Sequence, residues 1–79
     1  MTKIQEVNKE LMATTAFLNN YLDSKNEGFE NNQMRDQAIA AYNIAKRAFS
    51  EASSDESGYE VQAGHLEAVG KMLSEAIKE

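Results

Sequence analysis

Residues 32–52, NQMRDQAIAAYNIAKRAFSEA, carry the most regular pattern in the chain. Small or apolar side chains recur there at alternating steps of four and three, namely at Met34, Ala38, Ala41, Ala45, Ala48 and Ala52. This spacing is typical of a helix that packs lengthwise against another helix. Because most of the seam is alanine, a neighbouring helix can approach closely and must supply the larger side chains.

A second helical pattern precedes this one, over about residues 2–24. Its apolar positions fall in one narrow stripe, formed by Ile4, Val7, Leu11, Leu18 and Leu22. Thr2, with Gln5 three positions later, is typical of a helix start, because both side chains can pair with free backbone N–H groups. The stretch 25–32 offers Gly28, which can adopt a positive φ, and an asparagine able to cap the next helix.

The third helical pattern, over about residues 58–77, has more apolar positions than one seam needs. One seam contains Tyr59, Ala63, Leu66, Gly70, Leu73 and Ile77, and an adjoining face contains Val61, His65, Ala68, Val69, Met72 and Ala76. Together they cover well over half of the circumference, whereas a surface helix of a bundle needs an apolar arc of little more than about 100°. The excess predicts a second contact surface. The alternative is a third helix that packs centrally and buries both faces within the bundle.

Local signals at the third helix leave two points open. Its N-terminus is preceded by two overlapping capping boxes, which pair Ser53 with Glu56 and Ser57 with Glu60. Either box can begin the helix. Gly64 and Gly70 each cost up to about 1 kcal/mol relative to alanine inside a helix, and they predict the close approach of another backbone.

These patterns predict an all-α fold with a single helical domain over residues 1–79. At about 1.5 Å per residue the three helices have similar lengths, and short polar connections favour antiparallel neighbours. A small antiparallel three-helix bundle follows. A helical hairpin whose third helix completes a homodimer fits the same pattern. A chain of this size buries only roughly 60% of the surface that it exposes when unfolded, so the burial of further surface in a dimer would stabilise it.

The composition argues against several classes of function. Without cysteine the chain has no disulfide, thiolate zinc site or thiol nucleophile, which fits a cytoplasmic location. Eight Lys and Arg against 13 Asp and Glu give a net charge of −5, so nucleic-acid binding is not expected. The longest apolar run is far below the roughly 20 residues of a spanning helix, and the N-terminus lacks the pattern of a signal peptide, so we expect neither membrane insertion nor secretion.

The sequence also gives no catalytic residue, metal ligand or cofactor site. His65, the only histidine, has no acid or second histidine three or four residues away on either side. Asp23 opens a stretch that resembles a calcium-binding loop. However, Lys25 stands at its third ligand position, and Met34 stands where a bidentate glutamate is needed. We therefore expect a protein that is not an enzyme.

The surplus apolar face carries the functional prediction. It indicates a small acidic protein-interaction module, an adaptor or inhibitor, which in size, acidity and helicity resembles bacterial and phage accessory proteins. The predicted interface residues are Val61, His65, Val69 and Met72, with Phe17 as an addition from the first helix.

Two alternatives remain. The first is a self-assembling structural or chaperone-like helical protein, which the alanine seam favours. The second is an oligomer that sequesters a nucleotide, in which Tyr59 or Tyr21 stacks on the base and Arg35, Lys46 or Arg47 meets the phosphate. The expected partner is thus a protein or a second copy of the chain, rather than a small molecule, a nucleic acid or a membrane.

Overall fold

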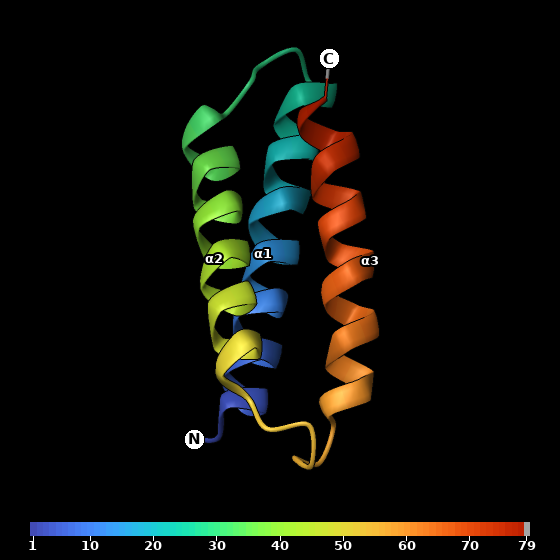
Figure 1. Ribbon diagram of the computed structural model, residues 1–79. Coiled ribbons are helices and arrows are strands. Elements are labelled where there is room, and N and C mark those ends of the chain that lie inside the picture. Colours follow the sequence, from blue (N-terminus) through green and yellow to red (C-terminus); the bar gives the residue numbers. More distant parts are fainter. Residues whose placement is uncertain (79) are drawn as a thin grey trace.

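A computed structural model, which describes residues 1–78, shows three α-helices that run up, down and up (Figure 1). They are α1 (Lys3–Asn26), α2 (Asn32–Glu51) and α3 (Tyr59–Ile77). The predicted all-α bundle, in which consecutive helices are antiparallel, is confirmed within one copy, and each helix begins and ends within two residues of its prediction. The bundle is elongated, with Cα extents of 45 × 19 × 14 Å.

Side-chain caps begin the first two helices. At α1 the Thr2 hydroxyl accepts a hydrogen bond from the Gln5 backbone N–H (3.1 Å), and the Gln5 side chain accepts one from the Thr2 N–H (2.9 Å). The predicted capping box is therefore present. At α2 the Asn31 side-chain oxygen accepts from the Met34 N–H (3.3 Å), so an asparagine caps this helix as expected.

Gly28 ends α1 in the way the sequence predicts. Its φ of +86° lies in the left-handed region, which glycine adopts without strain. The Gly28 N–H donates to the Lys25 carbonyl (3.0 Å), and the Phe29 N–H donates to the Ser24 carbonyl (2.8 Å). This pair of bonds is a Schellman motif, which satisfies two carbonyls at the helix end.

The start of α3 differs from both predicted capping boxes. Neither Ser53 nor Ser57 caps the helix, because Gly58, with φ of +86°, reverses the chain immediately before its first residue. The Glu56 carboxylate, which one box would direct to α3, instead accepts a 3.5 Å hydrogen bond from the Ile4 N–H at the start of α1. The prediction was wrong because the loop forms a hydrogen bond with the start of α1 rather than with the start of α3, the helix that follows it in the chain.

The core lies mainly between α1 and α2, which pack closely along their length, whereas α3 packs less closely on both. The four inner alanines of the seam are buried, namely Ala38, Ala41, Ala45 and Ala48. Larger side chains from α1 meet them in two clusters. The first contains Val7, Leu11, Ala45, Ala48 and Val69, and the second contains Leu18, Tyr21, Ala38 and Leu73. The predicted division of small and large side chains between neighbouring helices is confirmed.

Aromatic side chains of α2 connect that pair of helices to α3. The Tyr42 hydroxyl donates to the Leu66 carbonyl (3.2 Å), and the Phe49 and Tyr59 rings stack with centroids 4.6 Å apart. The Tyr42 ring also lies against Gly70, where a Cβ would overlap it. Gly70 therefore allows the close approach of the Tyr42 side chain, whereas the sequence predicted the close approach of another backbone.

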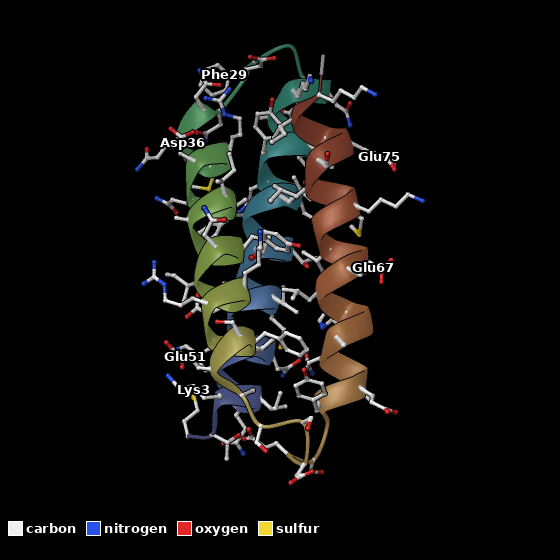
Figure 2. The ribbon with its side chains drawn as sticks, in the orientation of Figure 1. Lys3, Phe29, Asp36, Glu51, Glu67 and Glu75 are labelled. Atoms are coloured by element: carbon white, nitrogen blue, oxygen red, sulfur yellow. The ribbon has the colours of Figure 1, made fainter. Side chains whose placement is uncertain are left out.

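One exposed ion pair connects α1 to the end of α2. Lys3 Nζ lies 2.8 Å from Glu51 Oε1, and the two side chains meet at the lower end of the bundle (Figure 2). Their hydrogen bond and mutual attraction lower the pKa of Glu51 and raise the pKa of Lys3.

This pair predicts a small pH-dependent contribution to stability. A lowered carboxyl pKa contributes stability above the pKa of the unfolded state, and that contribution disappears as the pH falls through the folded-state pKa. We expect Lys3→Met to lower the thermal midpoint slightly at neutral pH and to leave it unchanged in acid, where Glu51 is protonated. Melting curves from pH 2 to 7 test this, with Lys9→Met as the control for loss of one charge from α1. An equal loss at both ends of the range would contradict it.

Candidate interaction surface

α3 presents an exposed apolar stripe on the flank opposite Leu66 and Gly70, the residues that meet Tyr42. Its members recur at steps of four, three and four, namely Val61, His65, Ala68 and Met72. Val61 is 70% exposed and Met72 is 47% exposed. Ala68 is exposed as well, and His65 is half-buried. Apolar side chains on one helix flank are thus left uncovered by the bundle.

α1 extends this stripe. The Gln62 amide nitrogen donates to the Asn8 side-chain oxygen (3.2 Å) and so joins α3 to α1. Because the two helices run in the same direction (Figure 1), Met12 and His65, about one turn further along, lie at a similar height. Met12 is 61% exposed, and the Asn8 amide lies 3.7 Å from its sulfur.

We define the α1–α3 surface as these two adjoining helix flanks. It contains Asn8, Met12, Thr15 and Asn19 from α1 and Val61, His65, Ala68 and Met72 from α3. None of the eight residues is an acid, a lysine or an arginine, although 27% of the whole chain is charged. By helical spacing, Asp23 on α1 and Glu75 on α3 are the first charged residues beyond them on the same flanks. On α1 the run 11–22 has no charged residue at all. Loss of charge together with exposed methionine is characteristic of the centre of a protein interface.

Hydrogen bonds hold the polar residues of this region in place. His65 Nδ1 lies 3.2 Å from the Gln62 side-chain oxygen, which can only accept, so this nitrogen is the donor. Gln62 is buried and has both ends of its amide paired, one with His65 and one with Asn8. Among residues 1–78, no buried side-chain nitrogen or oxygen lacks a hydrogen-bond partner.

Of the five predicted interface residues, three lie on the α1–α3 surface: Val61, His65 and Met72. Val69 does not, because it is 3% exposed and packs in the first core cluster. Phe17 is half-buried and packs against the second core cluster rather than standing free. The burial of Val69 corrects the predicted interface, whereas half-buried Phe17 lies away from the α1–α3 surface and stays a prediction. At Val69 the cause is that the core arc of α3 is centred between the two predicted seams, so this valine turns inward.

Four exposed large apolar residues were not predicted, namely Met1, Met12, Phe29 and Ile44. Met12 lies on the α1–α3 surface, and the signal that indicates it is its place in the uncharged run 11–22. Phe29 is 65% exposed in the connection between α1 and α2 (Figure 2). Phe29 is exposed because it directly follows the left-handed Gly28. The sequence predicted the role of the glycine but not the exposure of the residue after it.

The tyrosines named for nucleotide stacking are already engaged. Tyr21 is buried in the second core cluster, and Tyr59 stacks on Phe49. Arg35, named for phosphate, pairs with Asp36 at 3.3 Å. These contacts give the nucleotide alternative no support.

Residues 1–78 contain no pocket and no group of three or more His, Asp or Glu side chains placed to hold a metal ion. Within the same range, every helix is too short or too polar to cross a membrane. The described residues thus form a small three-helix bundle in which Met12, Val61 and Met72 are exposed on adjoining flanks of α1 and α3. Comparison of the chain with protein-family models, curated proteins and solved structures finds no match in any of the three.

Proposed function

We propose that this chain is a small non-catalytic protein-interaction module that binds a protein partner through the α1–α3 surface. The observation that carries the proposal is the exposure of Met12, Val61 and Met72 on adjoining helix flanks without a charged residue among them. Full burial of an apolar side chain of this size contributes about 1.5–3 kcal/mol of binding free energy. A partner that covers all three side chains gains most of that free energy for each of them. The lack of cysteine supports action in the cytoplasm.

The self-assembling alternative rested on the alanine seam of α2. That seam is buried against α1 within one copy of the chain, so it is not free to drive assembly. An interaction module therefore accounts better for the surface that remains.

Site-specific photo-crosslinking tests the proposal. A photoreactive residue at position 61 is expected to capture a defined protein in cells, whereas the same residue at position 43, on the exposed face of α2, is not. The captured protein is then purified and its dissociation constant is measured for the natural chain, Met72→Glu and Asn43→Glu. We expect binding to weaken at least about tenfold for Met72→Glu only, because the new carboxylate loses its hydration when a partner covers it.

Circular dichroism provides the control for folding, because both variants should keep the helicity of the natural chain. Equal affinity for the two variants would place the binding site elsewhere. Loss of helicity in Met72→Glu alone would show that Met72 belongs to the core.

A further inference from the structure

We propose that α3 detaches from the bundle and unfolds as one unit while α1 and α2 stay folded against each other. This conformational change goes beyond the proposed function, because it does not depend on which protein the α1–α3 surface binds. Small single domains ordinarily unfold as one cooperative unit. Three features set α3 apart: its shallow packing, its few polar contacts with the other helices and its own low helix stability.

α3 is packed less deeply than α1 and α2. Within α3, all of which the structure describes, Val69 and Leu73 are the only buried apolar side chains. The third buried side chain of this helix is the polar Gln62. α1 instead buries large apolar side chains along most of its length, from Ile4 to Tyr21, and most of them pack on the alanine seam of α2. Because hydrophobic stabilisation follows the apolar area that is buried, removal of α3 costs less than separation of α1 from α2.

Few polar contacts hold α3 in place. Within residues 1–78, two hydrogen bonds and no ion pair join it to the other helices. The Gln62 amide donates to Asn8 on α1, and the Leu66 carbonyl accepts from Tyr42 on α2. Water can replace both partners when α3 leaves, so each bond adds little net stability. The ion pair at the lower end of the bundle joins α1 to α2 and does not involve α3.

α3 is also a weak helix by itself. It begins after Gly58 without a side-chain hydrogen bond, whereas side chains cap both α1 and α2. Gly64 and Gly70 lie inside it, and glycine is the poorest helix former apart from proline. A helix of 19 residues with these features is marginal in water once it loses its packing. Detachment and unfolding of α3 therefore occur together.

The open state, in which α3 is detached, differs from the closed bundle in the apolar surface that it presents. Val69 and Leu73 enter solvent, and Val7 and Leu11 of α1 lose the cover that Val69 provides. The α1–α3 surface is lost at the same time, because it needs both helices in place. A partner that spans α1 and α3 therefore favours the closed state, so its binding and the docking of α3 are coupled.

Native-state hydrogen exchange measures the opening of each helix separately. We expect the slowest amides of α3 to exchange at least about tenfold faster than the slowest amides of α1 and α2. Low concentrations of urea should accelerate the exchange of α3 less steeply than that of α1 and α2, because detachment exposes less surface than complete unfolding.

Two matched alanine-to-glycine variants test whether α3 opens as a separate unit. Ala40 on α2 and Ala68 on α3 are both exposed, so each change lowers helix propensity without removing core packing. Ala40→Gly destabilises the closed and open states alike, so it should accelerate exchange in α1 and α2 about two- to fivefold and leave α3 unchanged. Ala68→Gly destabilises the closed state alone, so it should accelerate exchange in all three helices by the same factor.

Three results would overturn the inference. The first is equal exchange of the slowest amides in all three helices. The second is an Ala40→Gly variant in which α3 is accelerated as much as α1 and α2, because the helices then unfold together. The third is fast exchange in α3 that responds neither to urea nor to Ala68→Gly, which would indicate local fluctuation rather than detachment. None of these results bears on the proposed function, which crosslinking at position 61 tests separately.

Discussion

Ala45→Leu is expected to lower the free energy of unfolding by about 1–3 kcal/mol, because it adds three carbons at a fully buried position of α2 that packs against α1. Ala45 has no exposed surface and packs in the first core cluster with Val7 and Leu11, which already fill the space beside it. A chain of 79 residues is expected to have a total stability of only about 4–12 kcal/mol, so this single change removes a large part of it. Urea denaturation followed by circular dichroism measures the difference.

Ala40→Leu is the matched control for Ala45→Leu. Ala40 lies on the same helix but on its exposed side, so the same three carbons extend into solvent. Because leucine is nearly as good a helix former as alanine, its effect should stay within about 0.5 kcal/mol. If the two variants lost the same stability, the close packing of the alanine seam against α1 would be contradicted.

The sequence predicts the α1–α2 pair well because local and periodic signals agree there. The alanine seam, the apolar stripe of α1, the Thr2 capping box and the Gly28 helix end each depend on residues that are close in the chain. Rules of helix spacing and capping act over such distances. Neither the local capping signals nor the periodic spacing depends on how a third helix packs.

The rotation of α3 is harder to predict for the opposite reason. Apolar side chains cover more than half of this helix, so periodicity allows two overlapping seams and the core takes a position between them. Gln62 shows the cause most clearly, since a buried glutamine is favourable only because Asn8, 54 positions away in the chain, accepts its hydrogen bond. The orientation of α3 that buries Gln62 also buries Val69 and leaves Val61 and Met72 exposed.

The same limit applies to the candidate surface on α1. Whether Phe17 or Met12 remains exposed depends on which side of α1 the third helix occupies, and the stripe of α1 does not contain that information. α3 lies beside Asn8, which makes Met12 the exposed neighbour of the α3 stripe. Met72 was therefore predicted from the sequence of α3, whereas Met12 and its place beside the α3 stripe were not.

Gly64→Ala and Gly70→Ala should change the stability of the bundle in opposite directions, although both glycines lie inside α3. A Cβ at position 64 would meet nothing within 4 Å in residues 1–78 beyond its own stretch of helix, so alanine gains about 0.5–1 kcal/mol through helix propensity alone. A Cβ at position 70 would overlap the hydroxyl and ring of Tyr42. That ring cannot withdraw without breaking its 3.2 Å hydrogen bond to the Leu66 carbonyl, so we expect a net loss of about 1–2 kcal/mol.

A double-mutant cycle identifies Tyr42 as the cause of the loss at position 70. Tyr42→Leu removes the overlapping atoms, and in that background Gly70→Ala should become stabilising by about the amount seen for Gly64→Ala. Urea denaturation of the four chains, at concentrations where each is monomeric, gives the coupling energy. Were Gly70→Ala to stabilise the natural chain as much as Gly64→Ala does, the contact between α2 and α3 through Tyr42 would be refuted. An unchanged effect of Gly70→Ala in the leucine background would instead assign its loss to a neighbour other than Tyr42.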